Sequence, residues 1–192
     1  MMSDTRENIL TTALELFAKD GYEAVSASMI AGKLGMTKGA LYKHYKNKRD
    51  RFDSILLRME SVDSVQEKKY GMEDNAISDK MENVRCYSKA MFRYWTEESF
   101  PSNFRKLLTL EQYRSEEMSK LYQQYLAGGP LEYMAGILGS MKEAMDFYGP
   151  FFLMYSLYDG TDDKKGVLDM ADEHIDRFVE LASLFFSEYM LY

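Results

Sequence analysis

The sequence has few of the residues from which disulfide frameworks, metal sites and acid–base catalysts are built. Its 192 residues include one cysteine, Cys86, and two histidines, His44 and His174. A single cysteine excludes an intramolecular disulfide framework and a cysteine-rich zinc site, and it fits a reducing compartment. We expect Cys86 to be a buried apolar residue and His174 to lie on the surface, since its acidic neighbours do not converge on it at helical spacing. The sequence therefore predicts no catalytic residue, no metal ligand and no cofactor.

Long apolar runs are missing as well. The longest run, residues 147–158, contains Gly149, Pro150 and Ser156, and it is shorter than the about 20 residues that span a bilayer. No basic-then-apolar leader is visible, so we expect a cytoplasmic protein. Only 3 prolines and 12 glycines interrupt the chain, which suits long helices.

Helical periodicity takes the place of these features. Apolar residues recur three and four positions apart, and no stretch keeps the alternation of a strand, so we predict an all-α fold. Residues 131–145 show one such pattern, Gly128–Pro130 is the strongest stop, and Gly149–Pro150 is expected to open a new helix. Helix starts are predicted at Asp4, Ser26, Thr37 and Asn47, and helix ends at Gly21 and Gly35.

Charge is distributed unevenly along the chain. The formal net charge is −7, yet residues 1–50 carry +2 and the remaining residues carry −9. Between Lys19 and Arg51 the balance reaches +5. A basic island on an acidic chain is typical of a small nucleic-acid-binding module joined to a larger body.

Residues 26–45 have the pattern of a helix-turn-helix. Two short helices that cross closely need a small residue, Ala31, and a turn residue that tolerates a positive φ, Gly35. The second helix would enter the major groove, where Lys38 can read guanine and small Gly39 permits close approach. An Ala-x3-Gly pair alone also occurs in ordinary helical cores. The residues predicted to contact DNA are Ser26, Ser28, Thr37, Lys38, Gly39, Ala40, Tyr42, Lys43, His44, Lys46 and Lys48.

These residues, taken as a set, resemble the N-terminal domain of the TetR family of bacterial transcription regulators. The resemblance covers about the first 55 residues and departs from the family at Ala27, Met29 and Tyr45. It implies three DNA-binding helices in residues 1–47 and a divergent ligand-binding and dimerisation domain in residues 48–192, with residues 48–70 as the linking helix. The resemblance is carried by Glu7–Leu10, Ala13, Leu14, Phe17, Gly21, Tyr22, Ile30, Ala31, Gly35, Lys38, Gly39, Leu41, Tyr42, His44, Tyr45 and Lys48.

The C-terminal segment has a heptad seam that suits a helix–helix interface. The seam runs from Leu168 to Tyr189 and follows a helix that is apolar on nearly every side. Two such helices from each of two subunits predict a four-helix dimer interface, and an intramolecular core is the alternative. The residues predicted to dimerise are Phe151, Tyr155, Ile175, Phe178, Ala182 and Phe185.

Methionine is abundant, with 15 residues in the chain. Its flexible, polarisable side chain suits a pocket that repacks around an apolar ligand, although an ordinary core is again the alternative. We place the predicted pocket within residues 80–155. Its predicted ligand-binding residues are Met91, Trp95, Tyr113, Met118, Tyr122 and Phe152.

The sequence thus predicts a homodimeric transcription regulator, a repressor that leaves a palindromic operator when a small apolar or aromatic effector binds. One alternative is a DNA-bound protein whose helical body recruits a protein partner and has no effector. A helical enzyme with an incidental helix-turn-helix is disfavoured, because no acid–base pair has productive spacing.

Overall fold

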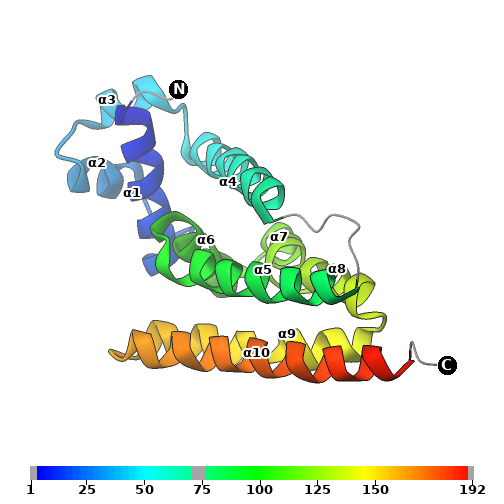
Figure 1. Ribbon diagram of the computed structural model, residues 1–192. Helices are drawn as coiled ribbons and strands as arrows, with labels where there is room; N and C mark the ends of the chain where they lie inside the picture. The colour runs from blue at the N-terminus through cyan, green and yellow to red at the C-terminus, as the bar shows by residue number, and fades with distance from the viewer. Residues whose placement is uncertain (1–3, 71–76, 190–192) are drawn as a thin grey trace. The chain divides into compact units, whose positions relative to one another are not determined.

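The computed structural model describes the backbone of residues 4–70 and 77–189 and the side chains of residues 4–61 and 80–184. All regular secondary structure in this part of the chain is helical, which confirms the predicted fold class (Figure 1). None of the described helices is both long and apolar enough to cross a membrane. The helices are α1 (Asp4–Asp20), α2 (Ala27–Lys33), α3 (Lys38–His44), α4 (Lys48–Tyr70), α5 (Ile77–Glu97), α6 (Ser99–Glu111), α7 (Glu116–Leu126), α8 (Gly128–Leu138), α9 (Met141–Gly160) and α10 (Lys164–Tyr189).

The helices group into two units by their contacts. The first unit comprises residues 1–64 and 99–127, and the second comprises residues 65–98 and 128–192. Helices α6 and α7 therefore belong with α1–α3, although α5 stands between them in the chain. The functional boundary after residue 47 stays a prediction.

The core of the first unit is built around one face of α1. Ile9, Leu14 and Phe17 on this face have no exposed surface, and α1 packs against α2 and α6. Burial of each such side chain stabilises the fold by about 1.5–3 kcal/mol. Phe52 from α4 and Phe104 from α6 are equally buried and complete this core.

The predicted caps of the short helices are confirmed. The Ser26 hydroxyl accepts a hydrogen bond from the Met29 amide at 3.3 Å, and the Thr37 hydroxyl accepts one from the Ala40 amide at 3.1 Å. Gly21 and Gly35 take positive φ values of +88° and +65° at the predicted helix ends. Asn47 likewise caps α4, its side-chain oxygen accepting from the Asp50 amide at 2.8 Å.

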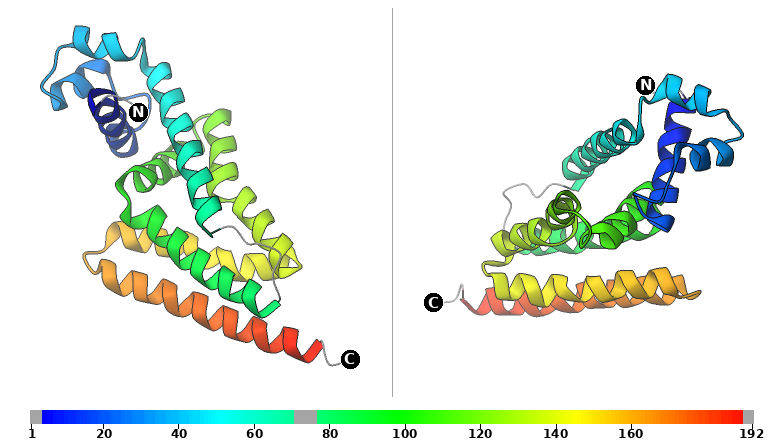
Figure 2. Two further views of the ribbon diagram at one scale, coloured as in Figure 1. Left: turned by 45° about the horizontal axis from the view of Figure 1, so that its top comes forward. Right: turned by 180° about the vertical axis from the view of Figure 1, so that it is seen from behind.

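In the second unit α9 and α10 lie antiparallel, and both pack against α5 (Figures 1 and 2). Phe92 on α5 stacks on Tyr155 of α9, with ring centroids 5.1 Å apart. Beside these rings, Arg93 of α5 holds the Asp172 carboxylate of α10 through two hydrogen bonds of 2.8 and 2.6 Å. The second unit therefore combines an aromatic core with an ion pair between α5 and α10.

Two predicted helix boundaries were wrong. Helix α9 runs unbroken through Pro150, whereas we expected a new helix to open there. Proline removes one backbone hydrogen bond, and the buried rings of Phe147 and Phe151 on either side oppose that loss. The pattern over residues 131–145 is split between α8 and α9, because Gly139 takes φ +93° and the Ser140 hydroxyl accepts from the Glu143 amide at 3.3 Å.

Two expectations about single side chains were also wrong. Cys86 is exposed, and its thiol lies 3.6 Å from a carboxylate oxygen of Glu82. His174 is half-buried, with ring atom Nε2 2.7 Å from the Phe147 carbonyl oxygen. The helical pattern near each residue did not show whether a neighbouring helix covers it.

Candidate nucleic-acid interface

Helices α2 and α3 form the predicted helix-turn-helix. The Met36 amide donates to the Ala31 carbonyl at 2.9 Å, and the Gly35 amide donates to the Gly32 carbonyl at 3.2 Å, which closes the turn. Ala31 and Leu41 are buried where the two helices meet. The apolar sides of both short helices are thereby used for packing, and the polar side of α3 is left exposed.

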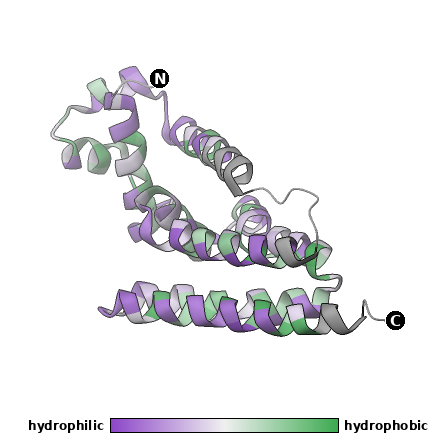
Figure 3. Cartoon of the chain, viewed as in Figure 1, coloured by the Kyte–Doolittle hydropathy of each residue, from purple (hydrophilic) through white to green (hydrophobic). Residues whose placement is uncertain are grey.

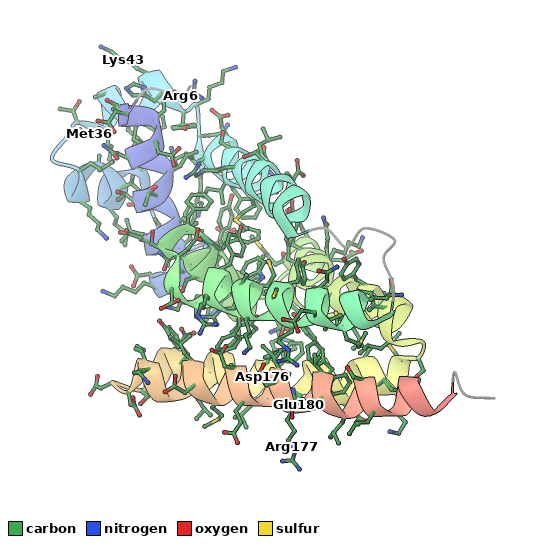
Figure 4. All side chains as sticks on the ribbon, in the orientation of Figure 1. Arg6, Met36, Lys43, Asp176, Arg177 and Glu180 are labelled. Atoms are coloured by element: carbon green, nitrogen blue, oxygen red, sulfur yellow. The ribbon has the colours of Figure 1, made fainter. Side chains whose placement is uncertain are left out.

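The exposed side of α3 carries most of the predicted DNA contacts. Its lysines include Lys43, whose side chain extends away from the helix (Figure 4). Lys38, Lys43 and Lys46 form no ion pair with any residue that the structure describes, so their charges are available to a ligand. Ser26, Ser28, Thr37, Lys38, Gly39, Tyr42, Lys43 and Lys46 are exposed, and Ala40, His44 and Lys48 are half-buried.

Gly39 lies in the first turn of α3, and the fold itself does not require a glycine there. A Cβ added at this position would have the Thr37 hydroxyl oxygen as its nearest neighbour, at an ordinary distance of 3.8 Å. At Gly21, by contrast, an added Cβ would lie 2.9 Å from the Glu111 carboxylate. Gly21 therefore serves packing, whereas Gly39 leaves free space on the exposed face of α3.

The end of α3 is held by Tyr45, which follows the helix directly. The buried Tyr45 hydroxyl donates to the Arg6 carbonyl oxygen at 3.2 Å, and the Arg6 guanidinium lies 4.8 Å from the centre of the Tyr45 ring. Burial raises the pKa of this phenol, so it remains a neutral donor at ordinary pH. The hydroxyl of Tyr45 thus fixes α3 to α1.

Lys48, one of the residues predicted to contact DNA, is already bound within the protein. Its ammonium donates to the Tyr22 and Glu23 carbonyl oxygens, at 3.0 Å each, and lies 3.3 Å from the Glu23 carboxylate. The same ammonium sits 4.7 Å from the centre of the Tyr22 ring. Lys48 therefore joins the start of α4 to the loop after α1, and its contact with DNA stays a prediction.

Sequence reasoning missed Glu111 at the end of α6. This carboxylate is 3% exposed, and it accepts hydrogen bonds from the Tyr22 amide and from Arg114, each at 3.0 Å. It therefore joins α6 to the loop that precedes the helix-turn-helix. Tyr22 and Glu111 are 89 positions apart in the chain, and nothing in the sequence indicates that they come into contact.

The six predicted ligand-binding residues are divided between the two units. Tyr113 is 90% exposed, Met118 is buried and Tyr122 is half-buried in the first unit. In the second unit Trp95 is buried, while Met91 is half-buried and Phe152 is 39% exposed. Neither unit alone brings the six together, and the effector pocket stays a prediction.

The predicted dimerisation residues mostly face the core of their own protomer. Phe151, Tyr155 and Ile175 are buried, and the Phe178 ring lies 4.7 Å from that of Phe147, measured between centroids. Ala182 is half-buried, and the side chain of Phe185 lies outside the described residues. For the buried residues, then, the structure follows the alternative of an intramolecular core.

Other apolar side chains on α9 and α10 are exposed. Apolar positions recur along both helices (Figure 3), and Arg177 of α10 points away from α5 while Asp176 points toward it (Figure 4). Leu181 and Leu184 follow Arg177 at helical spacing on this outward side. We define the outward α9–α10 surface by its exposed apolar residues, which are Phe152, Leu153, Leu157, Met170, Leu181 and Leu184.

No group of three or more His, Cys, Asp or Glu residues is placed to hold a metal ion within the described parts of the chain. The first unit instead presents α3 as an exposed basic helix, which is held by apolar packing and hydrogen bonds.

Comparisons with known proteins concern the N-terminal residues and the whole fold separately. The family model described as bacterial regulatory proteins, tetR family, matches residues 9–55. The chain is 44% identical over 52 residues to the HTH-type transcriptional regulator AcrR of Shigella flexneri. This match covers 27% of this chain and 24% of that protein. The match thus spans about a quarter of the length of the curated relatives.

Solved structures resemble the chain over nearly its full length. The fatty acid degradation regulator FadR of Bacillus halodurans has a TM-score of 0.65 at 14% identity, covering 93% of this chain and 96% of its own. The TetR family transcriptional regulator PfmR of Thermus thermophilus has a TM-score of 0.61 at 25% identity, covering 90% and 97%. The helical body therefore has the same fold as these regulators.

Proposed function

From its membership of the TetR family of bacterial regulatory proteins, we propose that the chain is a cytoplasmic, homodimeric, ligand-responsive repressor that binds a palindromic operator. The family is one of transcriptional regulators and not of enzymes. The observation that carries the proposal is the exposed face of α3 and the residues that follow it, where Lys38, Lys43 and Lys46 have no ion-pair partner among the described residues.

Binding of this face to DNA is tested by salt titration. Each lysine that neutralises a phosphate releases a counterion, so the logarithm of affinity falls linearly with the logarithm of salt concentration. Lys43→Ala should weaken binding to every duplex, while Lys38→Ala should relax the preference at one base pair by about 1–3 kcal/mol. A wild-type protein that selects no duplex from a random pool would contradict the proposal.

The outward α9–α10 surface supports the homodimer. Its apolar residues lie on two neighbouring helices, and two copies would form a four-helix interface about a two-fold axis. Leu181→Glu places a charge on this surface and should give monomers in light scattering at micromolar concentration. Leu57→Glu is the matched control, because Leu57 is an exposed leucine on α4 and is not one of the residues that define this surface. A monomeric wild type would contradict the proposed interface.

An effector site in the helical body is the remaining part of the proposal. Buried Trp95 and half-buried Met91 on α5 support it, and Trp95 is the only tryptophan in the chain. An apolar or aromatic effector should change Trp95 fluorescence saturably and release DNA with a coupling of about 1–3 kcal/mol. Thermodynamic reciprocity requires DNA to weaken effector binding by the same factor. A compound that binds tightly without changing DNA affinity would contradict the switch.

A further inference from the structure

Arg51 is a buried charge without a partner. It is the fourth residue of α4, is 1% exposed, and its Nε and Nη1 atoms are buried with no hydrogen-bond partner. No hydrogen bond or ion pair joins its side chain to any other residue that the structure describes. The other charged residues of comparable burial, Arg105 and Glu111, do have partners. Arg51 therefore differs from every other buried charge in the described part of the chain.

Such a charge is unfavourable in the free protein. Burial lowers the pKa of the Arg51 guanidinium, but arginine does not lose its proton in proteins. A buried charge without a partner is costly, and an apolar residue of similar size is often more stable in its place. The position next to Phe52 and Ile55, both fully buried, would accept such a residue. The charge is thus better explained by a bound ligand than by the stability of the fold.

The surroundings of Arg51 indicate what this ligand is. The titratable groups close enough to affect the pKa of its guanidinium are Tyr42, Tyr22 and Asp50. Tyr42 is a 49% exposed residue on the DNA-facing side of α3. The buried charge therefore lies close to the surface that the proposed function assigns to DNA.

The neighbouring cations of α4 are already neutralised. Lys48 is held by Tyr22 and Glu23, as described above, and Arg49 pairs with Asp53 and Glu117, each at 2.7 Å. Arg51 is thus the cation in the first turn of α4 whose charge no neighbour balances at contact distance. Within a poorly polarisable interior such a charge acts over a longer range than it would in water.

We propose that Arg51 is a buried electrostatic anchor for DNA, whose charge is balanced only when a backbone phosphate of the duplex lies over Tyr42 and the first turn of α4. The inference rests on the proposed function, and it adds a buried residue whose charge attracts the phosphate without an exposed side chain. Arg51 carries no sequence information in this role, so its contribution is the same for every duplex.

The test compares Arg51→Met, which has similar length and no charge, with Arg51→Lys, which keeps the charge. Binding to a fluorescently labelled mixed-sequence DNA duplex is followed by anisotropy over a range of salt concentrations. Arg51→Met should bind about tenfold more weakly at low salt, and its salt slope should be smaller by about 0.9. Arg51→Lys should keep the slope of the wild type. Without DNA, Arg51→Met should melt at the wild-type temperature or above it.

Arg49→Met is the matched control, since the same change is made two residues away on a cation that is exposed and paired. It should leave the salt slope nearly unchanged. A folded Arg51→Met variant with wild-type slope would overturn the inference, and so would an equal loss of slope in Arg49→Met. If Arg51→Met does not fold, Arg51→Gln replaces it, and equal slopes for Arg51→Gln and Arg51→Lys would overturn the inference. Failure of the wild type to bind any duplex would instead contradict the proposed function.

Discussion

Replacement of Gly39 by alanine should separate the stability of the protein from its affinity for DNA. Gly39 lies in the first turn of α3, and the nearest atom to an added Cβ would be 3.8 Å away. Alanine is more favourable than glycine within a helix by about 0.5–1 kcal/mol, because glycine loses more backbone entropy on folding. Since the added methyl group meets no clash, Gly39→Ala should raise the free energy of unfolding by up to that amount.

The effect on DNA should have the opposite sign. If the first turn of α3 lies against the base edges, the methyl group would hold the helix away from them and weaken the neighbouring Lys38 contact. A good side-chain contact with a base is worth about 1–3 kcal/mol, so the affinity for a selected operator should fall by that amount. The affinity for a mixed-sequence duplex should change less, because phosphate contacts tolerate small displacements better than base contacts.

Gly32→Ala provides the control for this prediction. Gly32 is also an exposed helical glycine, lies on α2, and has no atom within 4 Å of its added Cβ. Chemical denaturation measures the unfolding free energy of both variants, and anisotropy with the selected operator measures their affinities. Gly39→Ala with unchanged operator affinity would refute the placement of the first turn of α3 against the bases, as would an equal loss of affinity in Gly32→Ala.

Two further predictions concern stability. Glu111→Ala leaves the Tyr22 amide without its acceptor and should lower the unfolding free energy, measured by urea denaturation, by about 1–3 kcal/mol. Glu111→Gln keeps an acceptor oxygen and should lower the unfolding free energy clearly less. Equal losses in the two variants would contradict the role of this hydrogen bond. Arg93 lowers the pKa of the Asp172 carboxyl, so the stability from this pair should be fully present above the unfolded pKa of about 3.9 and lost as pH falls through the lower folded pKa. Because both side chains are partly exposed, Asp172→Asn should lower the unfolding free energy by only about 1 kcal/mol at neutral pH. The variant and the wild type should become equally stable in strongly acidic solution. A stability difference that persists there would contradict the assignment of this pair.

The helix-turn-helix could be predicted almost completely because its determinants are local. The Ser26 and Thr37 caps each act on an amide three residues away, and Gly35 ends α2 through its own backbone conformation. Such interactions depend on residue type and short spacing, both of which are visible in a sequence. The same holds for the basic island, because its net charge follows from composition alone.

The α9–α10 region shows where periodicity stops being informative. The heptad pattern identified Ile175 and Phe178 as a seam, but a seam is equally satisfied by a helix of the same chain or of a second one. In the structure Ile175 is fully buried within its protomer, whereas Leu181 is 48% exposed. The choice between the two partners depends on which helices come together, and that information is not contained in the spacing of apolar residues.

The sequence by itself determined the helical class, the helix-turn-helix and its charge, since each arises from neighbouring residues within one or two turns. Only the tertiary structure showed that Glu111 supports the loop before the helix-turn-helix and that the Arg51 side chain is buried without a partner among the described residues. Both facts depend on contacts between segments far apart in the chain. Burial and pairing of a charge depend on everything that surrounds it, and the surroundings of Arg51 are created only when α4 packs into the folded unit.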